Sequence, residues 1–248
     1  MRPVLAVTLA LLSLGPPRLQ AQQHQRTYVL VHGAWGGGWD WRAVDSALSA
    51  RGHRVVRVTL TGQGERSHLA SPAIGLSTHI ADVVNTILWE NLRDVVLVGH
   101  SYGGMVVTGV VDQIPERIHR VVYVDAFLPD SGETALSLLD SIGAGFVRNS
   151  VREGMSVPPW VVDTTAVPRD VPQSVRTFTD TLRLLNPAGR LVPGTYLLTV
   201  QPGVTPDPFQ GFADRAAARG WPVYQLKADH NAQRSAVAGL VALLAGVP

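Results

Sequence analysis

The sequence of 248 residues contains no cysteine, which excludes disulfide frameworks, thiolate metal sites and a cysteine nucleophile. Neither sign of charge is in large excess, because 21 basic and 19 acidic residues leave a net charge of only +2. No run of Lys or Arg is present. So small a balance gives no electrostatic basis for nucleic-acid binding, and we expect no nucleic-acid partner.

Charged residues make up 16% of the chain and hydrophobic residues 46%, which indicates a folded protein with a large core. At the N-terminus, Arg2 precedes an apolar run over residues 4–14 that is too short to span a bilayer. Ala21 follows two prolines and offers a cleavage point. We therefore expect residues 1–21 to be a signal peptide and residues 22–248 a secreted or periplasmic domain without a membrane span; the alternative is an anchor that stays attached.

From residue 27 onward, short β-branched runs alternate with amphipathic stretches. Near-continuous apolar strands separated by helices indicate an α/β fold, with a mostly parallel central sheet covered by helices on both faces. The expected strands are 27–31, 55–59, 95–98, 121–124, 196–200 and 223–226, and the expected helices are 39–50, 78–88, 105–111 and 233–244. Residues 128–194 contain many prolines and no clear strand, so we interpret them as a helical cap over the sheet. A disordered linker is less consistent with spaced apolar residues such as Phe146, Trp160 and Phe178.

Gly99-His100-Ser101-Tyr102-Gly103 fits the pattern G-x-S-x-G. The motif directly follows an expected strand and precedes an expected helix, which is the setting of a nucleophile elbow. Such a turn exposes the serine hydroxyl and directs the N–H groups of the next helix toward the site. Ser101 is therefore the candidate nucleophile.

A serine nucleophile requires two N–H donors for the developing oxyanion. Tyr102 follows the nucleophile, and Ala34 lies in the loop after the first strand, so their backbone N–H groups are the candidate donors. The neighbouring glycine-rich stretch lacks the order of a phosphate-binding loop. We expect His32 to bond to loop backbone groups rather than act as a base.

The base should come after the last strand, which favours His230. We expect His100, beside the nucleophile, to point away from the site. Two acids are possible: Asp125 ends the strand 121–124, and Asp207 lies in the loop after 196–200. Catalytic groups gather at the carboxyl ends of parallel strands, which favours Asp125 and leaves Asp207 open.

In combination, residues 29–41 (VLVHGAWGGGWDW), 61–69, 94–104 (DVVLVGHSYGG), 121–132 and 229–231 (DHN) resemble α/β-hydrolases of the plant methylesterase/hydroxynitrile lyase type and their bacterial esterase relatives. The resemblance covers about residues 27–248. It implies Ser101 as nucleophile, His230 as base and Ala34 and Tyr102 as oxyanion donors. The acid of that family would fall at about Pro202, which cannot serve, and this departure strengthens Asp125.

The resemblance also bears on the reaction. Lyases of this type carry a lysine after the histidine and a threonine at the position of Gly33, whereas this chain has Asn231 and Gly33. A serine nucleophile also argues against a dehalogenase. We therefore expect a serine carboxylesterase that acts on small hydrophobic esters through an acyl-enzyme, without metal or cofactor. The alternative is a small-molecule receptor of the same fold with vestigial hydrolysis.

Overall fold

The computed structural model describes residues 25–205 and 207–247, so the expected signal peptide lies outside the described residues. Its centre is a six-stranded sheet in which every pair of neighbours is parallel. The strands, in the spatial order β2-β1-β3-β4-β8-β9, are Arg54–Val58, Thr27–Val31, Val95–His100, Ile118–Val124, Gly194–Thr199 and Val223–Leu226. Both the fold class and all six expected strands are confirmed, and the strand ends shift by at most three residues.

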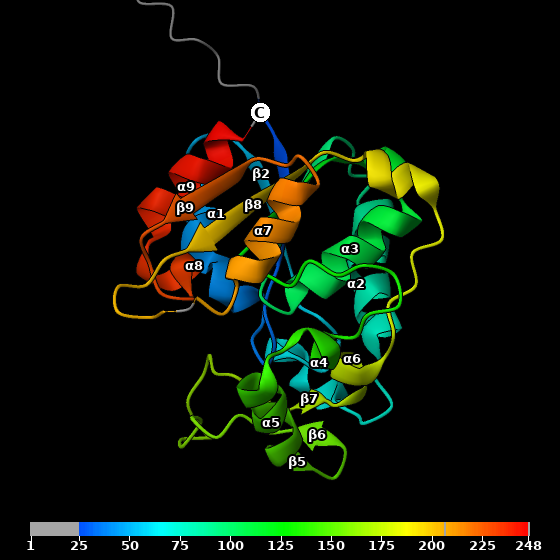
Figure 1. Cartoon of the computed structure of the whole chain (residues 1–248), viewed down its shortest axis with the longest axis vertical. Helices are drawn as coiled ribbons and strands as arrows, with labels where there is room; N and C mark the ends of the chain where they lie inside the picture. The colour runs from blue at the N-terminus through cyan, green and yellow to red at the C-terminus, as the bar shows by residue number, and fades with distance from the viewer. Residues whose placement is uncertain (1–24, 206, 248) are drawn as a thin grey trace, which may run out of the picture.

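Helices cover both faces of this sheet (Figure 1). Because successive strand side chains point to opposite faces, neighbouring residues enter different cores. Tyr28 and Leu30 pack with α1 (Arg42–Ser49), α8 (Ala232–Ser235) and α9 (Val237–Gly246). Val29 and Val31 pack with α2 (Leu76–Trp89), α3 (Gly103–Gln113) and α7 (Gln210–Ala218). Continuous apolar strands are the consequence of burial on both faces.

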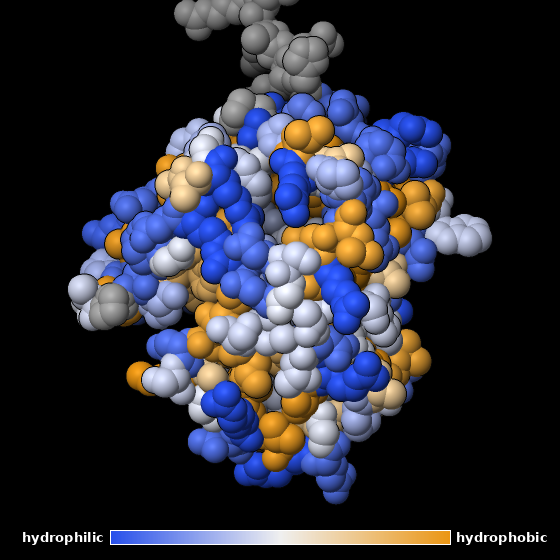
Figure 2. All heavy atoms as spheres, turned by 45° about the vertical axis from the view of Figure 1, so that its right-hand side comes forward, coloured by the Kyte–Doolittle hydropathy of each residue, from blue (hydrophilic) through white to orange (hydrophobic). Residues whose placement is uncertain are grey.

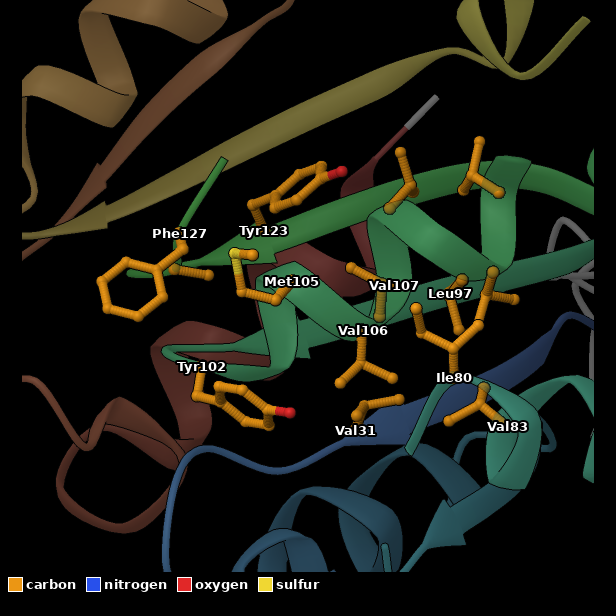
Figure 3. Close-up of a cluster of buried hydrophobic side chains, with 14 of the residues drawn as sticks. Val31, Ile80, Val83, Leu97, Tyr102, Met105, Val106, Val107, Tyr123 and Phe127 are labelled. Carbon is orange, nitrogen blue, oxygen red and sulfur yellow. The ribbon is translucent and has the colours of Figure 1, made fainter. Parts of the chain in front are cut away.

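The helix that follows the proposed nucleophile is among the most buried elements. Nine of the eleven residues of α3, from Gly103 to Val111, are buried. Figure 3 shows Met105, Val106 and Val107 of this helix among side chains of the sheet and of α2. A helix packed on all sides holds its first turn rigidly, and that turn adjoins Ser101.

Two helices differ from the sequence expectations. The expected helix 233–244 is divided into α8 and α9 at Ala236, where the backbone leaves the helical region (φ −137°, ψ 41°). Helix α7 was not expected, because its four alanines and two charged residues give a weak apolar pattern. No helix in the described part of the chain is long and apolar enough to cross a membrane.

The insertion between β4 and β8 forms a cap at the lower end of the molecule in Figure 1. It contains the expected helices, α4 (Ala135–Leu138), α5 (Ser141–Asn149) and α6 (Arg176–Thr179). A 3₁₀ turn at Pro187–Leu191, later in the same insertion, lies away from this cap and packs against the end of α3. The cap also contains a small antiparallel sheet of β5 (Val151–Arg152), β6 (Met155–Ser156) and β7 (Gln173–Ser174), which the sequence did not indicate. Two-residue strands are too short to give an alternating pattern.

Apolar side chains reach the surface on this cap, and they are visible at the lower end of Figure 2. Ile142 and Val162 are 80% and 92% exposed, and Trp160 is half-exposed. The cap is attached to the sheet domain by Trp35, whose ring contacts Phe146, Trp160 and Phe178 at centroid distances of 5.3–5.9 Å.

Candidate active site

Ser101 lies in a strained turn between β3 and α3. Its φ of 53° is in the left-handed region, which costs a non-glycine residue about 1–3 kcal/mol. Tight packing maintains this turn: a Cβ on Gly103 would lie 2.8 Å from the carbonyl oxygen of His32 and 2.9 Å from that of Val31. Only glycine fits between the elbow and β1, and the turn leaves the Ser101 side chain directed into a cavity.

His230 and Asp125 continue a line of hydrogen bonds from this serine. Ser101 Oγ lies 3.0 Å from His230 Nε2 and donates its hydrogen to it, and His230 Nδ1 donates to Asp125 Oδ2 across 2.6 Å. The second carboxylate oxygen of Asp125 accepts a 3.0 Å hydrogen bond from the backbone N–H of Thr199 on β8. Asp125 is only 2% exposed, so its carboxylate is held in one orientation. The structure thus brings together the three residues that the sequence suggested.

Asp207, the other candidate acid, is engaged elsewhere. Its Oδ1 accepts a 2.8 Å hydrogen bond from the backbone N–H of Phe209, at the start of α7. The Phe209 ring stacks on the imidazole of His230 with centroids 4.7 Å apart. In the described part of the chain, no carboxylate other than Asp125 forms an ion pair with His230. The loop after β8 therefore supplies an aromatic contact to His230, and Asp125 at the end of β4 supplies the carboxylate.

The expectation for His100 is wrong, because its side chain lies beside His230 and borders the same cavity. His100 Nε2–H donates a 2.8 Å hydrogen bond to the main-chain oxygen of His230. Burial, together with the neighbouring His230, lowers the pKa of His100 to about 4, so the ring is neutral near pH 7. A neutral ring has one acceptor nitrogen, Nδ1, which faces the amide of Gln233 at 3.4 Å. Sequence alternation could not reveal this contact, since it joins residues 130 positions apart.

The loop after β1 approaches the nucleophile closely. A Cβ on Gly33 would lie 2.9 Å from His100 Nδ1 and 3.0 Å from Ser101 Cβ, so a larger residue would displace the serine or the histidine. Trp35 N–H donates to Gln173 Oε1 at 2.8 Å. Within the described residues, no protein group accepts a hydrogen bond from the backbone N–H of Ala34 or of Tyr102. These two donors remain free for a ligand.

His32 lies beneath this loop and connects two strand ends, as expected. Its Nδ1–H donates to the oxygen of Gly33 at 2.7 Å, and its Nε2 accepts from the N–H of Leu60 at 3.1 Å. Complete burial lowers its pKa, so the ring stays neutral and fixes the loop. No group of three or more potential metal ligands is found in the described part of the chain.

The cavity in front of Ser101 has a volume of about 370 Å³. Its lining includes the indole rings of Trp35 and Trp160, the second of which belongs to the cap. It also includes three charged side chains, those of Asp40, Asp170 and Arg234, and Trp160 Nε1–H donates to Asp170 Oδ2 at 2.7 Å. The nucleophile and base therefore share a site of small-molecule size with two indole rings and one guanidinium group.

Residues 28–243 match the model of the family described as "Alpha/beta hydrolase family". The chain belongs to this family. It is 38% identical over 224 residues to the carbendazim hydrolyzing esterase of Nocardioides sp. (strain SG-4G), a match that covers 82% of this chain and 92% of that protein. Methylesterase 1 of Arabidopsis thaliana is 32% identical over 134 residues, which are 53% of this chain and 51% of that one.

The structural comparison shows the same fold. An extracellular alpha/beta-hydrolase from a Paenibacillus species has a TM-score of 0.75 at 24% identity, covering 88% of this chain and 97% of that one. That protein is described as sharing homology with tobacco Salicylic Acid Binding Protein 2. Whereas this chain spans about half the length of the plant methylesterases it matches, it spans nearly all of the Nocardioides esterase. This alpha/beta hydrolase is therefore an enzyme of the hydrolase class.

Proposed function

We propose that this alpha/beta hydrolase is a serine carboxylesterase that hydrolyses small hydrophobic carboxylic esters through an acyl-enzyme. One observation carries the proposal: Ser101, His230 and Asp125 form a continuous hydrogen-bonded line with distances of 3.0 and 2.6 Å at the edge of a cavity. The esterase activity named for the Nocardioides relative supports it.

In the proposed reaction, His230 Nε2 takes the proton of Ser101 while Oγ attacks the ester carbonyl carbon. Asp125 accepts a hydrogen bond from His230 Nδ1–H, which fixes the tautomer and stabilises the imidazolium. The N–H groups of Ala34 and Tyr102 donate to the oxyanion of the tetrahedral intermediate. His230 then protonates the leaving alkoxide, and a water molecule repeats the sequence on the acyl-enzyme.

The substrate class follows from the walls of the cavity. The indole rings of Trp35 and Trp160 lie 5.3 Å apart edge to face, so the acyl or alcohol group meets an apolar surface. The volume of about 370 Å³ suits a small molecule rather than a polymer. We further propose export after cleavage near Ala21, in line with the extracellular Paenibacillus neighbour, and N-terminal sequencing of the mature protein tests this.

The deciding experiment compares the wild-type protein with Ser101→Ala, using p-nitrophenyl butyrate and a fluorophosphonate probe. We expect Ser101→Ala to lose turnover by about 10⁶-fold and to lose all labelling, because the nucleophile is absent. Ser46→Ala, at an exposed position on α1, serves as the matched control and should behave as wild type.

Retention of most activity in Ser101→Ala would refute the assignment. A wild-type protein that is neither labelled nor active would instead favour the small-molecule receptor, a function suggested by the homology of its structural neighbour to a salicylic acid binding protein.

A further inference from the structure

Arg234 projects from α8 into the wall of the cavity that holds Ser101 and His230. Its Nε–H donates to Asp40 Oδ1, a contact that joins residues 194 positions apart. The guanidinium lies over the ring of Trp39, with 4.7 Å from its central carbon to the ring centroid. Two independent contacts therefore hold this cation in one place beside the nucleophile.

Asp40 is an unusual anchor, because its side chain is only 3% exposed. A buried carboxylate is costly unless its oxygens are hydrogen-bonded. Oδ1 accepts from Arg234 and Oδ2 accepts from Gln233 Nε2 at 2.8 Å. The ion pair thus fixes the position of Arg234 and satisfies Asp40.

The outer edge of the guanidinium remains available. Arg234 Nη2 lies 3.9 Å from Asp170 Oδ1, which is too far for a hydrogen bond. Within residues 25–205 and 207–247, the terminal nitrogens of Arg234 donate to no protein acceptor. Its side chain is 44% exposed and borders the cavity. A substrate oxygen in the cavity would meet free, charged N–H donors.

The surrounding charge decides which oxygen suits this site. Asp40 and Asp170 both border the cavity, so two carboxylates accompany one guanidinium and the group carries a net charge of −1. An anionic substrate would gain little attraction and would face Asp170. A neutral carbonyl oxygen accepts the hydrogen bonds without that repulsion.

We propose that Arg234 is a specificity-determining residue that donates hydrogen bonds to a second, neutral carbonyl group of the substrate, so that the enzyme favours diesters and related bifunctional esters. This inference rests on the proposed esterase function, and it adds a polar anchor to a cavity that the indole rings of Trp35 and Trp160 also line.

Three substrates of nearly equal shape test the proposal. Dimethyl succinate carries the second neutral carbonyl, methyl hexanoate replaces it by methylene groups, and monomethyl succinate carries a carboxylate. The variant Asp40→Asn/Arg234→Met removes both charges together, because Arg234→Met alone would leave Asp40 buried and unpaired. Arg54→Met, on an exposed ion pair of β2, is the control.

We expect the double variant to lower kcat/KM for dimethyl succinate by about tenfold, mainly through KM, since one charged hydrogen bond is lost. The value of kcat/KM for methyl hexanoate, which lacks the second carbonyl, should fall much less. Arg234→Lys keeps the ion pair but lacks the planar fork, so it should show an intermediate loss. Arg54→Met should leave all three rates unchanged.

An equal loss for dimethyl succinate and methyl hexanoate would overturn the proposal, because Arg234 would then act only through the structure of the site. A larger loss for monomethyl succinate than for dimethyl succinate would also overturn it, in favour of an anion site. If the wild-type protein hydrolysed p-nitrophenyl butyrate but not dimethyl succinate, this proposal alone would be overturned. If it hydrolysed none of these esters, p-nitrophenyl butyrate included, the proposed function itself would be refuted.

Discussion

Replacing Asp125 by asparagine tests the proposed acid with little change of shape. The new side chain would keep an oxygen for the N–H of Thr199, the bond that Asp125 Oδ1 makes at 3.0 Å. Its NH₂ group would then face His230 Nδ1, where the carboxylate lies at 2.6 Å. An amide donor at that position favours the tautomer with hydrogen on Nε2. His230 could then no longer accept the proton of Ser101.

The size of the effect follows from this loss of tautomer. The same replacement in the triad of a serine protease lowers kcat by about 10⁴-fold, which corresponds to about 5.5 kcal/mol in the activation free energy. Asp125 is 2% exposed, so like the aspartate of that protease it is a buried carboxylate. We therefore expect Asp125→Asn to lower kcat for p-nitrophenyl butyrate by about 10³–10⁴-fold with little change in KM.

Asp207→Asn is the matched control, because it removes the other candidate carboxylate. Within the described residues, the side chain of Asp207 accepts only the N–H of Phe209 at the start of α7, so its replacement should cost at most about 1 kcal/mol of stability, as loss of a helix cap does. Its kcat should stay near that of wild type. Steady-state kinetics and thermal unfolding of both variants separate the two effects. A larger fall of kcat in Asp207→Asn, or near-normal turnover in Asp125→Asn, would refute the reasoning.

Two further predictions concern the packing around the site. Gly33→Ala places a Cβ 2.9 Å from a nitrogen of His100, so kcat should fall at least about tenfold because the nucleophile elbow is displaced. Gly145→Ala is the control, since a Cβ there meets nothing within 4 Å and kcat should stay unchanged. Equal kinetics for the two variants would contradict this prediction. Burial lowers the pKa values of His79 and His100 to about 4 in the folded protein, against 6.5 in the unfolded chain. The unfolded state then binds more protons between pH 6.5 and 4, so stability is complete above pH 6.5 and should fall by about 1.4 kcal/mol per pH unit for each histidine as the pH decreases. Urea unfolding over this range should show the decline, with a shallower slope in His79→Gln than in the wild-type protein; identical slopes in the two proteins would contradict the prediction.

Much of the architecture could be predicted because it depends on local patterns. Burial on both faces makes each strand of a parallel sheet a continuous apolar run, and such runs at 95–98 and 121–124 are plain in the sequence. The elbow is also local, since glycines, serine, strand and helix are contiguous at residues 95–113. The order of the strands further places a late histidine, His230, at the same sheet edge as Ser101.

The remaining features depend on contacts between distant segments. The geometry that favours Asp125 over Asp207 comes from β8, whose Thr199 N–H donates to Asp125, and from the loop after β8, whose Phe209 ring stacks on His230. The small sheet of the cap forms from two-residue strands that have no pattern of their own.

The sequence by itself determined the class of fold, the nucleophile turn and the candidate base, because hydrophobic periodicity and glycine spacing act over a few neighbouring residues. Only the tertiary structure decided that His100 faces His230 and that Arg234 is anchored on Asp40. These contacts join residues 130 and 194 positions apart. They form because buried polar groups need hydrogen-bond partners, and a local sequence pattern does not show which distant residue will be the partner.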